Sequence, residues 1–184
     1  MTTDSSTPAA WVQGRWLRTG MRLAAPISQS TLVASLILAW DVAFCGSFLL
    51  SFLFCPFWFL GSVLKNAVQR PGWTVAVIRI VIPIVTLAIA LGNNELQLKG
   101  ARANASRIIN ACNRFHADKG TYPSKLEDLV PAYLPAVPPA KHCLAFGTFF
   151  YFDLGAKHML MWQVVPPYGR SIYTFEEAKW WSLD

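Results

Sequence analysis

The chain has 184 residues, of which 54% are hydrophobic and 14% are charged. Its mean hydropathy is +0.36. Ordinary soluble domains carry about 25% charged residues. The composition therefore excludes a disordered chain, a coiled coil and a nucleic-acid-binding domain, which would need a basic face that the sequence lacks. It indicates a membrane protein.

Residues 1–30 are predicted to form a basic amphipathic N-terminal arm. Arg15, Arg18 and Arg22 recur at helical spacing beside tryptophans. This pattern is typical of an amphipathic helix on an anionic lipid surface. It is equally typical of an arginine cluster that only sets the membrane topology.

Residues 31–92 are predicted to form the transmembrane region. The run 42–64 holds 23 residues without a charge, and the run 73–92 is nearly as apolar. Because about 20 apolar residues cross the hydrocarbon core of a bilayer, we predict a transmembrane helical hairpin with spans at about 42–64 and 73–92.

The apolar stretch already begins at Thr31, which leaves the path of its first half open. A straight helix over 31–64 would be about 51 Å long at 1.5 Å per residue, too long for one upright span. The segment therefore bends at Gly46 or Pro56, lies partly in the interface, or crosses the membrane twice as two short spans.

The charges in this region define the expected orientation. The positive-inside rule places the loop from Lys65 to Arg70 in the cytoplasm, which puts residues 93–184 on the opposite side of the membrane. The N-terminal arginines favour the opposite side if there are two spans, whereas three crossings would satisfy both clusters. We expect Arg79 to reach the loop interface and Asp41 to lie at the opposite interface, so the two do not pair.

Residues 93–184 are predicted to form a small α+β domain. Apolar side chains recur at helical spacing from Leu98 to Phe115, and a capping box from Ser124 to Glu127 opens a short helix. Four aromatic and β-branched runs then alternate with turns: FGTFFYFD, KHMLMWQVV, RSIYTF and KWWSL. Such runs predict an antiparallel β-meander with one face packed on the long helix.

The order of an apolar span, an amphipathic helix, the segment FHADKGTYPSKLEDLV and a strand meander resembles type IV pilins and type II secretion pseudopilins. The resemblance covers about residues 73–140. It implies a pilin-like fold on a bacterial inner-membrane anchor, with residues 93–184 in the periplasm. Pilins carry a glutamate at the fifth residue of the span, where this chain has Val77, so it lacks the prepilin processing motif. The positions that match the family pattern are Phe115, Asp118, Gly120, Tyr122, Pro123, Leu126 and Leu129.

The four cysteines divide equally between the two halves of the chain. Cys45 and Cys55 lie in the predicted first span, where a thiol behaves as a small apolar group. Cys112 and Cys143 lie in the domain and could form a disulfide in an oxidising compartment. His142 adjoins Cys143, but no further ligand follows at metal-binding spacing, so we predict neither a metal site nor a cofactor.

We predict that the protein is not an enzyme. Its predicted function is to present the periplasmic domain to an envelope, pilus or secretion component, with membrane lipid as a second partner. One alternative is a membrane-anchored inhibitor or immunity protein. Another is a small membrane enzyme in which Cys112 and His116 form a nucleophile–base pair. Exposed aromatic residues beside a basic one are typical of protein contacts, and the residues predicted to contact a partner are Arg170, Tyr173, Trp180 and Trp181.

Overall fold

A computed structural model describes residues 28–166 and 168–183, so the predicted basic arm lies almost wholly outside the described residues. The described part contains three helices that are long and apolar enough to cross a membrane, which is compatible with a membrane location. They are Ser28–Cys45, α2 (Leu49–Gln69) and α3 (Trp73–Lys119).

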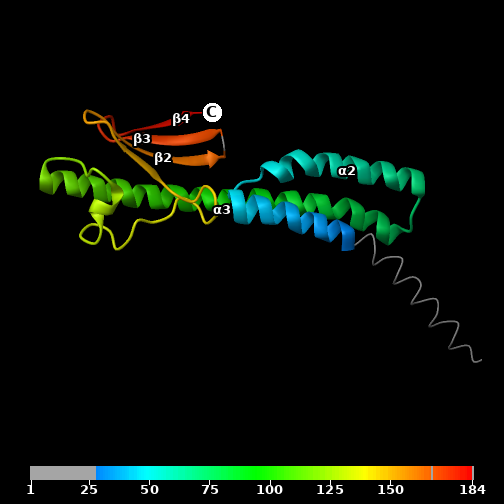
Figure 1. Cartoon of the computed structure of the whole chain (residues 1–184). Helices are drawn as coiled ribbons and strands as arrows, with labels where there is room; N and C mark the ends of the chain where they lie inside the picture. The colour runs from blue at the N-terminus through cyan, green and yellow to red at the C-terminus, as the bar shows by residue number, and fades with distance from the viewer. Residues whose placement is uncertain (1–27, 167, 184) are drawn as a thin grey trace, which may run out of the picture.

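The first helix, α2 and the N-terminal half of α3 form a helical bundle. The first helix and α2 lie beside the N-terminal half of α3, whereas the sheet covers its C-terminal half (Figure 1). The first helix and α3 run in the same direction and α2 runs in the opposite one. The described chain thus passes along the bundle three times. The predicted first span, 42–64, is divided in the structure between the end of the first helix and α2.

The predicted span 42–64 is interrupted after the first helix, whose last turns form a π-helix, η1 (Ala39–Cys45). Gly46 ends that helix with φ 59° and ψ 38°. This left-handed conformation is open to glycine at no steric cost, so the chain can reverse there. At 21 residues, α2 alone is about 31 Å long, which is enough to cross a membrane core of about 30 Å.

Asp41 determines where α2 begins. Its side chain is fully buried. Its two carboxylate oxygens accept hydrogen bonds from the backbone N–H groups of Leu50 (3.0 Å) and Ser51 (2.7 Å). The first N–H groups of a helix have no partner within the helix, so an acceptor placed beside them stabilises the helix start.

Arg79 lies at the other end of the bundle. Its guanidinium donates hydrogen bonds to the side-chain oxygens of Gln69 (3.0 Å) and Asn66 (3.5 Å), next to the loop between α2 and α3. The expectation that Arg79 reaches this loop is confirmed, and Asp41 and Arg79 do not pair.

Helix α3 joins the helical bundle to the domain without interruption. Its 47 residues are about 70 Å long at 1.5 Å per residue, more than twice the thickness of a membrane core. The helix ends at Gly120, where φ is 78°, and the Gly120 N–H donates to the carbonyl of His116 (2.8 Å). Its domain half, residues 93–119, turns a stripe of mostly small side chains toward the core: Ala101, Ala105, Ile108, Ala111 and Cys112.

The short helix that follows is a single 3₁₀ turn, η2 (Leu126–Leu129). The capping box predicted from Ser124 to Glu127 is wrong by one residue. The backbone N–H of Lys125 donates to the Asp128 carboxylate (3.2 Å), because the turn starts one residue later than the sequence pattern indicated. Leu126 and Leu129 are both buried against α3.

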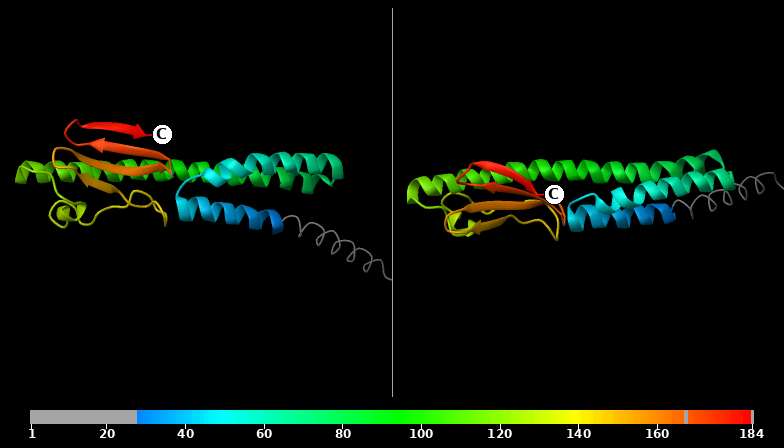
Figure 2. Two further views of the ribbon diagram at one scale, coloured as in Figure 1. Left: turned by 45° about the horizontal axis from the view of Figure 1, so that its top comes forward. Right: turned by 90° about the horizontal axis from the view of Figure 1, so that it is seen from above.

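Four strands form the sheet: β1 (Phe150–Asp153), β2 (His158–Val165), β3 (Gly169–Thr174) and β4 (Lys179–Leu183). They are antiparallel and lie side by side in chain order, which confirms the predicted α+β architecture and meander. Figure 2 shows the sheet lying along the domain half of α3. The inner face of the sheet buries Leu160, Trp162 and Tyr173 in the core.

We predict that Asp41→Ala destabilises the helical bundle by about 1–3 kcal/mol, the usual cost of leaving buried hydrogen-bonding groups without a partner. Thermal unfolding of the full chain in detergent, followed by circular dichroism, measures the effect. Asp41→Asn is the control, because its amide oxygen still accepts one hydrogen bond and the loss should be smaller. An unchanged unfolding midpoint for Asp41→Ala would contradict the capping role.

Candidate interaction site

A buried lysine connects the helical bundle to the sheet. The Lys141 side chain is only 2% exposed. Its ammonium Nζ donates to the carbonyl of Gly46 (3.0 Å) and to the carbonyl of Val164 in β2 (2.6 Å). Burial lowers the pKa of this ammonium to about 8, although Cys143 and Cys45 nearby act in the opposite direction.

Backbone hydrogen bonds fix the same loop to the first helix. The N–H groups of Leu144 and Ala145 donate to the carbonyls of Ala43 and Phe44, each at 3.0 Å. These bonds use carbonyls at the end of η1 that have no partner in a normal helical ladder. The loop that contains Lys141 is therefore attached to the point where the chain reverses.

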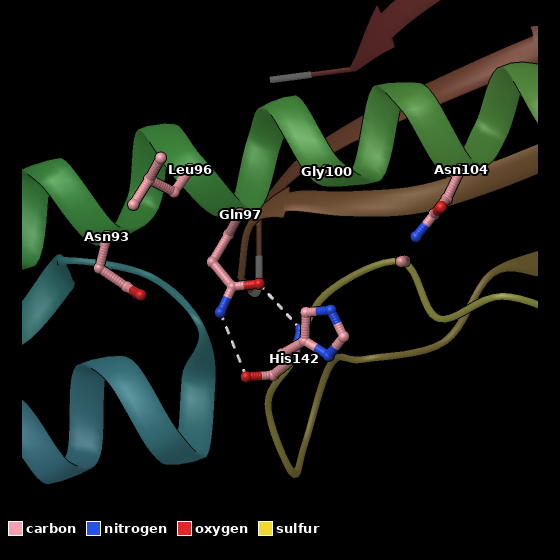
Figure 3. A pocket seen from close by; sticks show the side chains of 7 residues that line it. Asn93, Leu96, Gln97, Gly100, Asn104 and His142 are labelled. Atoms are coloured by element: carbon pink, nitrogen blue, oxygen red, sulfur yellow. Dashed lines mark hydrogen bonds between the residues drawn. The ribbon is translucent and has the colours of Figure 1, made fainter.

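A side-chain amide of α3 holds the loop from the other side. The Gln97 amide nitrogen donates to the His142 carbonyl (3.2 Å), and the His142 N–H donates to the Gln97 amide oxygen (2.8 Å). Figure 3 shows this pairing beside a pocket of about 190 Å³ that Asn93, Leu96 and Asn104 also line. With Lys141, the pairing sets the position of the domain on the bundle.

The outer face of the sheet, which points away from α3, carries an exposed apolar row. Cross-strand register places Phe150, Met161, Ile172 and Trp181 opposite one another on neighbouring strands. They alternate with the inward-facing residues, because successive side chains in a strand point to opposite faces. Phe150 and Trp181 are 43% and 47% exposed, and Met161 and Ile172 are half-buried.

The four residues predicted to contact a partner do not share one surface. Tyr173 is buried in the core. Trp180 lies on the same inner face, with its ring 5.1 Å from that of Trp162. Arg170 and Trp181 are exposed on the outer face, and the Lys179 ammonium lies 4.4 Å from the centre of the Trp181 ring. The sequence alone could not assign these faces, because the assignment depends on the register of the strands.

All four cysteines, which lie within the described residues, are free, so the structure contains no Cys112–Cys143 disulfide. Cys112 is buried against the sheet, whereas Cys143 lies beside Gly46 at the bundle. Residues 141–145 of the loop are held at the reversal point by the bonds of Lys141, Leu144 and Ala145, so Cys143 lies away from Cys112 in the core.

The geometry does not favour a Cys112–His116 nucleophile pair. Burial raises the pKa of the Cys112 thiol to about 12, and a protonated thiol is a poor nucleophile. The His116 ring is stacked on the Tyr122 ring, with centres 4.3 Å apart and planes at 8°.

The positions that carry the family resemblance surround the end of α3. The Tyr133 hydroxyl donates to the Asp118 carboxylate (2.9 Å), and the Tyr133 ring lies 5.4 Å from that of Phe115. Gly120 ends the helix, and Pro123 is buried. These residues thus form one packed corner at the end of the domain that is distant from the bundle.

An open groove of about 700 Å³ lies at this distant end, and the sequence analysis did not detect it. His158 stands there with its two ring nitrogens 3.3 Å from the Asp153 carboxylate and 2.7 Å from the Glu176 carboxylate. Although burial acts to raise it, hydrogen bonds from His158 lower the pKa of Glu176. Within residues 28–166 and 168–183, no three His, Cys, Asp or Glu side chains are grouped to hold a metal ion.

No protein-family model, curated protein or solved structure matches the chain. The pilin-like resemblance therefore stays a prediction.

We predict that Lys141→Met lowers the stability of the full chain by about 1–3 kcal/mol at pH 9, because one buried and one partly buried carbonyl lose their donor. Lysine in an unfolded chain keeps its proton up to about its ordinary pKa of 10.5. The cost of burying the charge is therefore fully present below pH 8 and is relieved as the pH rises toward 10.5. The free energy of unfolding of the wild type, taken relative to that of Lys141→Met, should therefore increase from pH 7 to pH 9.

Thermal unfolding midpoints at the two pH values measure this gain. Lys157→Met is the matched control, because the Lys157 side chain is 59% exposed and pairs with the exposed Glu177. Exposed pairs contribute about 0–1 kcal/mol, so this control should change little at either pH. Equal stability of Lys141→Met and the wild type at pH 9 would contradict the connecting role of Lys141.

Proposed function

We propose that the chain is a non-enzymatic protein of the bacterial inner membrane whose α+β domain binds another envelope protein on the periplasmic side. The exposed row Phe150, Met161, Ile172 and Trp181 on the outer face of the sheet carries this proposal. In an antiparallel sheet with one face in water, the side chains on that face are normally polar, and those on the core face are apolar. An apolar row on that face is instead typical of a protein contact surface.

The chemistry of the row suits a protein partner. Aromatic residues and methionine are enriched at protein interfaces, and methionine adapts its shape to the surface it meets. Strand β4 is exposed along its whole length and forms one edge of the sheet. An exposed edge offers unpaired backbone groups beside the apolar row, and these can extend the contact.

Two further observations support a periplasmic location of the α+β domain. Lys65 and Arg79 lie at the same end of the bundle, where they line one pocket, and Arg70 stands in the adjoining loop. The positive-inside rule favours the cytoplasm for that end. The opposite end then faces the periplasm, and the resemblance to pilins and pseudopilins implies the same side for the domain.

Photo-crosslinking in intact membranes tests the proposal. A benzophenone amino acid at position 181 should give a discrete adduct with another protein, and the same group at exposed Asn110, on α3, should give none. Ile172→Glu in the same chain should abolish the adduct, because it places a charge in the centre of the apolar row. Equal adducts from positions 181 and 110, or no adduct from either, would contradict the proposal.

A further inference from the structure

We propose that the end of the domain nearest the helical bundle is a lipid-binding surface that rests among the headgroups of an anionic phospholipid bilayer. This inference depends on the helices crossing a membrane and does not depend on the protein partner proposed above. The surface is formed by Tyr168 between β2 and β3, by Arg170 and Leu183 on β3 and β4, and by Leu144 at the tip of its loop.

The position of this surface follows from Lys141. Its ammonium bonds both to Gly46, where the chain reverses between the first helix and α2, and to Val164, near the end of β2. The turn after β2 therefore lies next to the end of the bundle. Tyr168 in that turn is 78% exposed.

Two other segments lie at the same height along the bundle as Tyr168, next to the reversal at Gly46. Strand register places Leu183 beside Arg170, and Arg170 beside Gln163, so the end of β4 lies next to the same turn. Leu183 is 54% exposed and Arg170 is exposed. Leu144, 82% exposed, is held against the first helix by its backbone bond to Ala43.

The length of α2 places this level at the membrane surface. A helix of about 31 Å matches a hydrocarbon core of about 30 Å, so the two ends of α2 mark the two boundaries of the core. The start of α2 is next to Gly46, where Lys141 brings the sheet. On α3 the apolar run gives way to Asn93 and Asn94, and Glu95 and Lys99 follow. The domain thus begins at the headgroup layer.

The composition of the surface fits that layer. Tyrosine side chains favour the interface between lipid and water, where the ring meets acyl chains and the hydroxyl meets water. Basic side chains near the surface are attracted to anionic lipids. Arg170 on the sheet and the exposed Lys99 and Arg102 on α3 supply positive charge there, against the exposed Glu95.

Fluorescence quenching in nanodiscs tests the inference on the purified full chain. A fluorescent amino acid is placed at position 168, and the discs contain phosphatidylcholine, phosphatidylglycerol and a lipid with a nitroxide on its headgroup. Position 73 is the positive control, because Trp73 is 82% exposed at the opposite end of the bundle. Position 154 is the negative control, because Leu154 is 62% exposed in the turn between β1 and β2, at the far end of the sheet.

The expected result is quenching at position 168 comparable with position 73 and several-fold stronger than at position 154. Arg170→Gln should weaken the quenching at position 168 in discs with phosphatidylglycerol and leave it unchanged in neutral discs. Quenching at position 168 as weak as at position 154 would overturn the inference, provided that position 73 is quenched. An equal effect of Arg170→Gln in both kinds of disc would overturn the preference for anionic lipid. Since no partner protein is present, these outcomes are independent of the crosslinking result.

Discussion

The arrangement of the whole molecule depends on the Asp41 carboxylate, which accepts hydrogen bonds from the first backbone N–H groups of α2. A membrane core offers no water to backbone groups, so a chain that reverses at its edge must satisfy those groups internally. Asp41 supplies the acceptor and Gly46 supplies the left-handed conformation. One long apolar stretch thereby becomes two helices, and the described chain runs along the bundle three times rather than twice.

The same reversal holds the domain in place. Lys141 donates to the carbonyl of Gly46 and to β2, while Gln97 holds the neighbouring residue of the loop from α3. Helix α3 continues from the bundle into the domain core, so the two parts share a rigid element as well as a junction.

Local patterns in the sequence predicted much of the fold. The apolar run at 73–92, the helix that ends at Gly120 and the four strand runs in chain order all depend on neighbouring residues. Three features depended on contacts between distant residues and were missed or misplaced. The sequence placed Asp41 at the end of the bundle opposite Arg79 but did not show that it accepts hydrogen bonds from the start of α2. The separation of Cys143 from Cys112 depends on the path of the loop, and the faces on which Trp180 and Trp181 lie depend on strand register. The exposed row could be found only after that register was known.

We infer that each of the three long apolar helices in the described chain crosses the membrane, and the side on which each end lies tests this most directly. Epitopes attached to the two ends of the chain are exposed to a protease that cannot enter sealed membrane vesicles. The account predicts that only one epitope is digested in sealed vesicles, and that the other is digested once the vesicles are opened. Digestion or protection of both epitopes together would place the ends on one side and contradict three crossings.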